Sequence, residues 1–344
     1  MSDEITRDEI RQWIINTPGA WFHLDDIKKQ FNISDSAYGK LRKAMHDFCL
    51  EGICEALGGR TGRYRRIDKD VRAVPFWLTG GSGDFPIIHP YGIDDNSHFG
   101  FETAFTFKRG SSYVIGGNTN AGKTLMAMNL CVLNMDNYHI KYFCLEASRY
   151  KYWDRIKNMD YVNIFKREGD PKDMKLEDCK FEFLPIKDTR YCLDYIEGAD
   201  IYIIDWINLT DEIWKIGDMI HNMVDKVDRN GQGIIVAVLQ KDVDSKFARG
   251  KTWSIDFADF GITLDYNRLT VLKCKPNSQL DNKTWRFNII KKGSRFNDIC
   301  EVVKCNKCHG FGKNFSKTCI ACNGTGYVDK EVWDNESKDW LQLL

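Results

Sequence analysis

The sequence predicts an α/β fold. It indicates a core built on a mainly parallel sheet, a small helical domain before it and a small cysteine-rich module after it. Three observations predict this. A short apolar strand at 112–116 runs directly into a glycine-rich loop and then into an apolar helix. Further apolar segments at 141–148, 200–209 and 233–241 are spaced as parallel strands separated by connections. Near the end of the chain, two Cys-x-x-Cys pairs follow one another.

The composition is that of a globular protein. The 344 residues allow two or three domains at about 150 residues each. The 49 basic and 49 acidic residues cancel, which excludes a histone-like polycation, so any nucleic-acid contact must come from a local patch. No apolar run approaches the roughly 18 residues of a membrane helix, and the acidic N-terminus lacks a signal core, so we expect a cytoplasmic protein. The 12 cysteines are then expected as reduced thiols or metal ligands.

The first domain, residues 1–72, is predicted to contain three helices and a hairpin. Thr6 and Glu9 have the spacing of a capping box, so a helix is expected to begin at Arg7 and to end near the Thr-Pro-Gly at 17–19. A second helix is expected over 24–31, and Ser34 is expected to cap a third that runs to about Leu50. Residues 51–67 are typical of a strand, a glycine-rich turn and a second strand.

Three helices followed by a basic hairpin resemble a winged helix-turn-helix domain. The resemblance implies that the third helix and the wing bind nucleic acid. Arginine suits phosphate contacts because its charge is permanent and its donors are forked. The alternative is a charged face on a protein-interaction module, a role that winged helices also have. The candidate nucleic-acid contacts are Lys40, Arg42, Lys43, Arg60, Arg63, Arg65 and Arg66.

Residues 73–100, rich in glycine and proline, are predicted to be a linker to a core at 101–300. The core begins with a nucleotide site that has the complete G-x-x-x-x-G-K-T pattern, flanked by the strand and helix that this motif requires. Backbone N–H groups of the loop would surround phosphate oxygens, Lys123 would neutralise the β- and γ-phosphates of ATP, and Thr124 would bind Mg²⁺. The loop consists of Gly117, Asn118, Thr119, Asn120, Ala121, Gly122, Lys123 and Thr124.

Polar residues at the ends of later strands complete this site. Asp205, near the end of the strand at 200–209, is expected to hold Mg²⁺ indirectly, whereas Asp200 begins that strand and lies on the wrong side. Glu146 is a candidate for orienting and deprotonating the attacking water; the alternative is a carboxylate in a salt bridge. Gln240 ends the strand at 233–241 and can sense the γ-phosphate. Two strands, within 257–266 and 268–277, are expected to pair antiparallel.

The order of these motifs resembles the RecA-type ATPase core, most closely that of DnaB-type replicative helicases and their phage relatives. The order is the P-loop, Leu-Glu at 145–146, Ile-Ile-Asp-Trp at 203–206, a strand ending in Gln240, and Lys273-x-Lys275. The resemblance covers about residues 86–295. It implies a ring or filament with sites at subunit interfaces, in which Glu146 is the catalytic carboxylate, Asp205 the metal-linked acid and Gln240 the sensor.

Two features depart from that family. DnaB-type helicases carry Lys-x-Arg on the late strand, and its arginine reaches into the neighbouring subunit's site. This chain has Lys273 and Lys275 in its place, and lysine cannot make the forked contact. Arg268 or Arg249 is a possible substitute. The N-terminal domain also differs from the primase-binding domain of those helicases, so primase coupling is not implied.

The C-terminal module, residues 301–328, is predicted to bind zinc. Cys305, Cys308, Cys319 and Cys322 lie in two matched C-x-x-C-x-G-x-G knuckles, which resemble the zinc repeats of DnaJ chaperones over about 305–327. Four thiolates would complete one tetrahedral, structural site. Free thiols or a redox pair are the alternative, and His309 is a competing ligand. Lysines around the module leave two roles open, which are holding nucleic acid and docking a partner. Residues 329–344 are expected to be a tail.

Two segments have no sharp assignment. The charged stretch 151–190 is expected to form surface helices and loops. The basic stretch 291–297 is expected either to face the channel of a ring or to be a solvated hairpin tip.

The sequence therefore predicts an ATP-hydrolysing RecA-fold protein that uses ATP, Mg²⁺ and Zn²⁺. We expect it to bind single-stranded or duplex DNA, to form a ring or filament of identical subunits and to act as a helicase or translocase. A replication or mobile-element protein is a possible partner, and no membrane is expected. The alternatives are an ATP-switched regulator or loader and a recombination or transposition accessory ATPase, both without unwinding activity.

Overall fold

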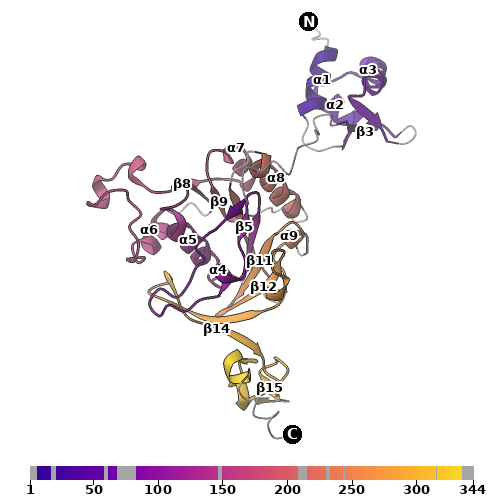
Figure 1. Ribbon diagram of the computed structural model, residues 1–344. Helices are drawn as coiled ribbons and strands as arrows, with labels where there is room; N and C mark the ends of the chain where they lie inside the picture. Colours follow the sequence, from indigo (N-terminus) through magenta and orange to yellow (C-terminus); the bar gives the residue numbers. More distant parts are fainter. Residues whose placement is uncertain are drawn as a thin grey trace. The chain divides into compact units, whose positions relative to one another are not determined.

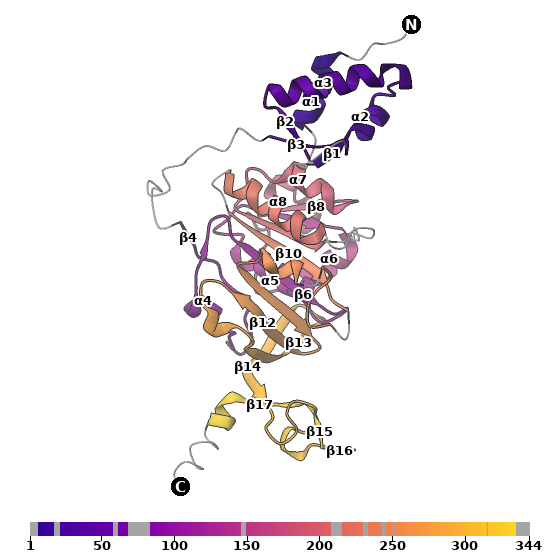
Figure 2. The same cartoon turned by 90° about the vertical axis from the view of Figure 1, so that its right-hand side faces the viewer.

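The computed structural model describes residues 6–16, 21–57, 61–67, 83–145, 149–207, 215–229, 233–242, 245–250, 252–314 and 316–334 (Figures 1 and 2). The chain divides into two compact units, Met1–Thr79 and Gly80–Leu344. Each has its own buried apolar core. The N-terminal domain predicted over 1–72 lies within the first unit, and the P-loop and the cysteine knuckles lie within the second.

The N-terminal unit has the predicted helices and hairpin. Thr6 N–H donates to Glu9 Oε2 at 2.7 Å, and Glu9 N–H donates to Thr6 Oγ1 at 3.3 Å, which is the expected capping box at the start of the first helix. The helices bury one apolar stripe each against the others, and Leu41, Met45 and Phe48 are the buried positions of the third. The elements are α1 (Arg7–Asn16), β1 (Trp21–His23), α2 (Leu24–Gln30), α3 (Tyr38–Leu50), β2 (Cys54–Ala56) and β3 (Arg63–Arg66).

Two details of this unit differ from the prediction. Ser34 makes no side-chain cap; its hydroxyl lies 2.9 Å from that of Ser36, a short 3₁₀ turn follows, and α3 begins only at Tyr38. In addition, β1 was not predicted, because three residues are too few to carry an alternating pattern. It pairs antiparallel with β3, so the hairpin strands belong to a sheet of order β1-β3-β2.

The second unit is built on one ten-stranded sheet. Its order is β17-β14-β13-β12-β11-β6-β10-β9-β7-β8. Neighbours from β11 to β8 run parallel, and those from β17 to β11 run antiparallel. The strands are β6 (Ser112–Gly117), β7 (Ile140–Cys144), β8 (Glu182–Pro185), β9 (Ile201–Ile207), β10 (Ile234–Gln240), β11 (Phe260–Asp265), β12 (Arg268–Cys274), β13 (Thr284–Ile290), β14 (Arg295–Lys304) and β17 (Tyr327–Asp329).

The strand order confirms the predicted fold class. The P-loop strand β6 lies between β11 and β10, and β10 separates it from β9, which carries Asp205. This is the mainly parallel order expected of a RecA-like core. Because parallel strands end at the same edge, the carboxyl ends of β6, β9 and β10 come together there. The predicted antiparallel pairing of β11 with β12 is also present.

Helices cover both faces of the sheet (Figure 2). Met126 and Leu130 of the P-loop helix pack with Ile115 and Val236 on one face. Ile220 of the amphipathic helix packs with residues such as Val114 on the other. The main helices of this unit are α5 (Lys123–Asn134), α6 (Arg149–Ile156) and α8 (Ile216–Arg229). Shorter ones are α4 (Phe101–Ala104), α7 (Cys192–Tyr195) and α9 (Trp253–Asp256).

One boundary prediction was wrong, and the expectation for 151–190 holds only in part. Residues 83–100 are part of the second unit rather than a linker: Phe85 and Phe99 are buried in its core, and β4 (Asp84–Phe85) pairs with β5 (Phe107–Lys108). The stretch 151–190 is only partly surface, because Met159 and Phe181 are also buried in that core. Both segments lack a sustained period because they consist of short elements and loops.

Residues from the first of these segments cover the outer edge of β14. Gly92 forms a parallel bridge with Phe296. The Asp298 N–H donates to Asp95 Oδ2 at 2.6 Å, and the Ile299 N–H donates to Ser97 Oγ at 2.9 Å. Further along the same strand, β17 pairs with Val302–Lys304. A single strand therefore belongs both to the sheet and to the cysteine module, which also contains β15 (Lys313–Asn314) and β16 (Lys317–Thr318).

Candidate functional site

The predicted P-loop lies at the carboxyl edge of the parallel strands. It connects β6 to α5, and Gly122, with φ +98°, ends it in a conformation that favours glycine. A Cβ on Gly117 would lie 2.7 Å from the Leu264 carbonyl oxygen, so only glycine allows the loop this close to β11. The Asn118 N–H donates to the same oxygen at 3.1 Å. The loop is therefore held against the neighbouring strand by its backbone.

Lys123 and Gln240 meet in this loop. The Lys123 ammonium donates to the Asn118 carbonyl oxygen at 2.7 Å and to Gln240 Oε1 at 3.1 Å. The Gln240 amide in turn donates to Thr119 Oγ1 at 3.0 Å. The structure thus brings the predicted sensor residue, from the end of β10, into direct contact with two P-loop residues that are far away in the sequence.

Thr124 and Asp205 are also brought together. The Thr124 hydroxyl donates to Asp205 Oδ1 at 3.4 Å, and the hydroxyls of Tyr142 and Tyr152 each donate to Asp205 Oδ2 at 2.7 Å. Burial raises the pKa of the Asp205 carboxyl, although these three hydrogen bonds act in the opposite direction. One carboxylate oxygen is fixed by the two tyrosines, and the other faces the threonine predicted to bind Mg²⁺.

A cavity of about 480 Å³ opens over these residues, and three further cations line it. Arg155 comes from α6, Arg249 from the segment after β10, and Lys292 from the turn between β13 and β14. Together with Lys123 they surround the P-loop from four separate elements. Asp205 is the carboxylate among the described residues that line this cavity. Among the described lining residues, the cavity therefore combines phosphate-compatible charge with the Asp205 carboxylate.

The segment that carries Arg249 folds back against the end of β10 and against the P-loop strand, β6. Lys241 and Ala248 form an antiparallel bridge, and the Arg249 N–H donates to the Gln240 carbonyl oxygen at 2.7 Å. A Cβ on Gly116 would lie 3.0 Å from that of Ala248, so the glycine leaves room for this segment. The sequence predicts Arg249 only as a possible substitute for the arginine that reaches into a neighbouring subunit's site. In the structure, Arg249 lines the cavity of its own chain.

The basic turn at 291–297 also reaches the cavity. Lys292 and Gly293 line it. The neighbouring Arg295 is buried and forms ion pairs with Asp94 and Asp160. The Ser294 hydroxyl donates to the Asn158 carbonyl oxygen at 3.1 Å. The base of the turn is thus anchored to the core, whereas Lys291 and Lys292 at its tip are exposed, as expected for a hairpin tip. A channel-facing role in a ring stays a prediction.

Lys273 and Lys275 lie away from the P-loop of their own chain. Cys274, between them, pairs with Phe260 at the start of β11, whereas the P-loop edge is at the end of that strand. The Lys273 ammonium donates to the carbonyl oxygens of Ile255 and Asp256, at 3.0 and 2.7 Å. Lys275 donates to Asp259 Oδ1 at 2.9 Å. Contact of either lysine with a neighbouring subunit stays a prediction.

Two predicted site residues, Glu146 and Arg60, lie outside the described residues. The chain just before Glu146 is described: Cys144 ends β7 in register with Asp205, and the Leu145 N–H donates to the Asp205 carbonyl oxygen at 3.1 Å. The chemical role of Glu146 therefore stays a prediction.

The four predicted metal ligands converge in the C-terminal module. The sulfurs of Cys305, Cys308, Cys319 and Cys322 all lie within 4.8 Å of one another and are buried. Two of the sulfur–sulfur distances are 3.6 and 3.9 Å, near the about 3.8 Å that tetrahedral zinc with Zn–S of about 2.3 Å requires. The N–H groups of Gly312 and Gly326 donate to two of these sulfurs. The donor set therefore fits zinc, and His309 is exposed rather than part of the cluster.

The basic face of the N-terminal unit is smaller than the sequence indicates. Lys40, Arg42, Lys43 and Arg63 are exposed. Arg65, however, pairs with Glu55 at 2.5 Å and lies over the Trp21 ring, and Arg66 donates to the Ile15 carbonyl oxygen. Arg65 therefore links β3 to its two neighbours in the small sheet, and Arg66 links β3 to the end of α1.

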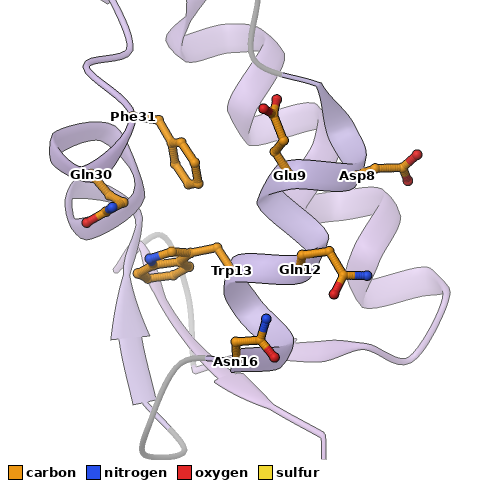
Figure 3. A pocket seen from close by; sticks show the side chains of 7 residues that line it. All are labelled: Asp8, Glu9, Gln12, Trp13, Asn16, Gln30 and Phe31. Carbon is orange, nitrogen blue, oxygen red and sulfur yellow. The ribbon is translucent and has the colours of Figure 1, made fainter.

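The same unit carries a shallow groove between α1 and α2 (Figure 3). Its floor is formed by Trp13 and Phe31, and Asp8 and Glu9 lie on its rim. The carboxylates make this groove unsuitable for phosphate. Its lining residues are Asp8, Glu9, Gln12, Trp13, Asn16, Gln30 and Phe31.

The sequence did not indicate that Tyr142, Tyr152 and Arg155 belong to this site, nor that Lys292 lines the cavity over the P-loop. The tyrosines appear in the sequence as ordinary apolar positions, and nothing local indicates that their hydroxyls meet Asp205. Arg155 and Lys292 reach the site through packing between distant elements. The only available signal for Lys292 was its position in a basic turn between two strands.

Comparisons with known proteins add little to this geometry. No protein-family model and no curated protein matches the sequence. Among solved structures, the chain is similar to a KaiC-like protein, PH0186, from the hyperthermophilic archaeon Pyrococcus horikoshii OT3. The identity is 17%, the match covers 61% of this chain and 98% of that one, and the TM-score is 0.45. Within the described part of the chain, no helix combines the length and apolar character needed to cross a bilayer.

Proposed function

We propose that this protein is an ATP-hydrolysing RecA-type motor that acts on nucleic acid. One observation carries the proposal: Lys123, Thr124, Asp205 and Gln240, from three separate elements, meet around one cavity at the carboxyl edge of a parallel sheet. Ligands of α/β proteins bind at this edge. The four side chains supply an ammonium, a hydroxyl, a carboxylate and an amide, which together match the needs of a metal-bound triphosphate.

The residues present fit ATP and Mg²⁺. The buried Asn118 Oδ1 has no partner among the described residues, and a Cβ at either end of the loop would clash, at Gly117 with the Leu264 carbonyl oxygen and at Gly122 with Ile289. In this proposal Lys123 binds the β- and γ-phosphates, and Thr124 and Asp205 hold the metal. Mg²⁺ would neutralise phosphate charge as the terminal bond breaks. Glu146 would orient and deprotonate the attacking water, and Gln240 would sense the γ-phosphate.

The other parts of the chain have proposed roles around this motor. Zinc held by the four cysteines would be structural, because no ligand position remains open. The exposed basic residues of α3 and β3 would contact nucleic acid. Assembly into a ring or filament follows from the resemblance to DnaB-type helicases, and strand separation is the finer form of the proposal.

A second candidate is an ATP-switched regulator, loader or accessory ATPase without unwinding activity. One observation favours it: Lys273 and Lys275, at the position of the family's finger, already donate to acceptors of their own chain. Moreover, a lysine there lacks the forked geometry of arginine. If the site is completed in cis, ATP can control conformation or assembly without driving translocation.

The deciding experiment measures ATP turnover with and without single-stranded DNA, beside Lys123→Ala and Glu146→Gln. For a motor, DNA stimulates turnover and both substitutions lower it by about 100-fold or more. Separation of a forked duplex then tests the helicase form. Stimulation without separation favours the second candidate. Turnover that is negligible with any nucleic acid contradicts the motor.

A further inference from the structure

A groove of about 650 Å³ lies between the cysteine module and the antiparallel end of the sheet. Its walls come from the turn between β11 and β12, from β13, from the second knuckle and from β17. Two tyrosines, an arginine and three asparagines account for much of its chemistry: Tyr266, Asn267, Arg268, Asn288, Asn323 and Tyr327. Flat rings beside amide groups are suited to a planar ligand with hydrogen-bonding edges.

Of the aromatic and cationic groups that line this groove, Tyr266 is exposed, and Arg268 and Tyr327 are half-buried. Tyr266 is 63% exposed, at the tip of its turn. The Arg268 guanidinium lies over the second aromatic ring of the groove, 4.8 Å from the centre of the Tyr327 ring. Arg286 pairs with Asp298 and Asp329, whereas Arg268 has no carboxylate partner among the described residues. Arg268 is therefore the cation of this groove that remains for a ligand.

The module beside the groove has the positive charge expected of a surface that binds a polyanion. Residues 302–328 contain no aspartate or glutamate. Their four lysines, at 304, 307, 313 and 317, are all exposed, and outweigh the two negative charges that a zinc tetrathiolate would carry. Phe311 and Ile320 are 82% and 91% exposed on the same module. Lysines interleaved with exposed apolar side chains are typical of surfaces that bind unpaired bases and their phosphates.

The groove is also connected to the P-loop. Asp265, the last residue of β11, accepts from Asn118 Nδ2 at 2.9 Å and pairs with buried Lys241 at 2.5 Å. Tyr266 and Asn267 follow directly. Asp265 therefore links Asn118 of the P-loop to the turn that carries Tyr266.

We propose that this groove and the adjoining cysteine module bind single-stranded nucleic acid, with bases stacked on Tyr266 and Tyr327 and the backbone along the lysines. Duplex offers no free base faces to the tyrosines, and an acidic peptide would use the lysines but not the rings and amides. The inference rests on the proposed function in taking nucleic acid as the partner, and it adds where the strand binds.

The test uses full-length, zinc-loaded protein without nucleotide, and the anisotropy of a fluorescent oligothymidylate. Tyr266→Ala is expected to raise the Kd about five-fold or more, because stacking is lost. Tyr195→Ala, which removes a tyrosine of similar exposure outside the groove, is expected to leave the Kd unchanged. Lys313→Glu with Lys317→Glu is expected to flatten the dependence of the Kd on salt. Affinity for a hairpin-free duplex is expected to be the same for Tyr266→Ala and wild type.

A Kd for Tyr266→Ala equal to that of wild type, with zinc content and nucleic-acid-free ATP turnover retained, overturns the proposal. So does displacement of the oligothymidylate by polyglutamate at equal charge concentration, which would indicate an acidic protein partner. If wild type shows no ATP turnover but binding depends on Tyr266, the motor fails and the groove stands.

Discussion

At the scale of single residues, Asp205 illustrates how function opposes stability. Its carboxylate is buried, and burial raises its pKa. Hydroxyls of Tyr142, Tyr152 and Thr124 compensate only part of the cost of removing the charge from water. Burying a carboxylate is expensive for folding, and this carboxylate is the group that the proposed metal site requires.

Asp205→Asn is therefore expected to raise the Tm of the nucleotide-free protein while it lowers Mg²⁺-dependent ATP turnover by about 100-fold or more. The folded-state pKa of Asp205 lies above its unfolded value, so its contribution to stability is greatest below the unfolded pKa and is lost as pH rises through the folded pKa. The gain in Tm from the substitution is thus expected to be larger at pH 7 than at pH 4. Thermal melts at both pH values, with turnover assays, measure this.

Asp200→Asn provides the matched control, because Asp200 lies directly before the opposite end of the same strand. Asp200 precedes β9 at its other end and accepts from the His139 N–H at 3.0 Å, a bond that asparagine can keep. Both Tm and turnover are expected to stay near wild type. Equal losses of turnover in the two variants would contradict the assignment of Asp205 to the metal site.

At the scale of elements, short connections complete the nucleotide cavity. The segment Lys241–Arg249 and the β13–β14 turn deliver Arg249 and Lys292, and α6 delivers Arg155. These cations belong to the same chain as the P-loop. The arrangement of these elements therefore favours a site whose cations come from one chain. In the DnaB-type pattern, a neighbouring subunit supplies an arginine instead.

Arg249→Ala is accordingly expected to lower kcat by about 100-fold or more, since arginine stabilises charge on the transferred phosphoryl group. Mixing Arg249→Ala subunits with Lys123→Ala subunits is expected to give no recovery, because neither chain then holds a complete site. Arg190→Ala, an exposed arginine outside the cavity, is the control and is expected to be fully active. Recovery of turnover on mixing would show that Arg249 acts on a neighbouring subunit.

The sequence predicted the strands and the loop of this site but not the cations that line the cavity. The P-loop was found through its complete G-x-x-x-x-G-K-T pattern, and β9 and β10 were found because they are apolar strands with Asp205 and Gln240 near their ends. The cavity cations were missed because their position depends on tertiary anchors. Arg295, for example, fixes the β13–β14 turn through Asp94 and Asp160, which are far from it in sequence. No local period reports such pairs.

At the scale of the whole molecule, the chain consists of two units with separate cores. The cysteine module lies within the second unit and has a small core of its own. The predicted order of these parts is present, but the boundaries are not where composition suggested. Residues 83–100 contain glycine and proline and still belong to the core, because their apolar residues, such as Phe85 and Phe99, are buried. The boundary expected at 300–301 divides β14, since a strand shared by two parts leaves no break in the sequence.

Removal of metal is expected to unfold the module and leave the nucleotide core folded. The apolar core of the module consists of the four cysteines with Val328 packed against them. Zinc in such small domains contributes about 10 kcal/mol or more to folding. One zinc per chain is expected in wild type, with loss of zinc in Cys319→Ser and on chelation. ATP turnover without nucleic acid is expected to persist.

Cys300→Ser is the matched control, because Cys300 lies on β14 outside the cluster. It is expected to keep its zinc. A wild-type protein that contains no zinc, or that forms a Cys305–Cys319 or Cys308–Cys322 disulfide under reducing conditions, would contradict the metal assignment.

The covered edge of β14 has a consequence for how this protein behaves at high concentration. A bare strand edge recruits strands from other molecules and leads to aggregation. Here the side chains of Asp95 and Ser97 occupy two outward N–H groups, and β17 pairs with the remainder near the module. The segment that resembled a linker thus acts as a guard against intermolecular sheet growth. Fragments cut between residues 83 and 100, or truncated before β17, would lose this protection even where every residue of the proposed nucleotide site is retained.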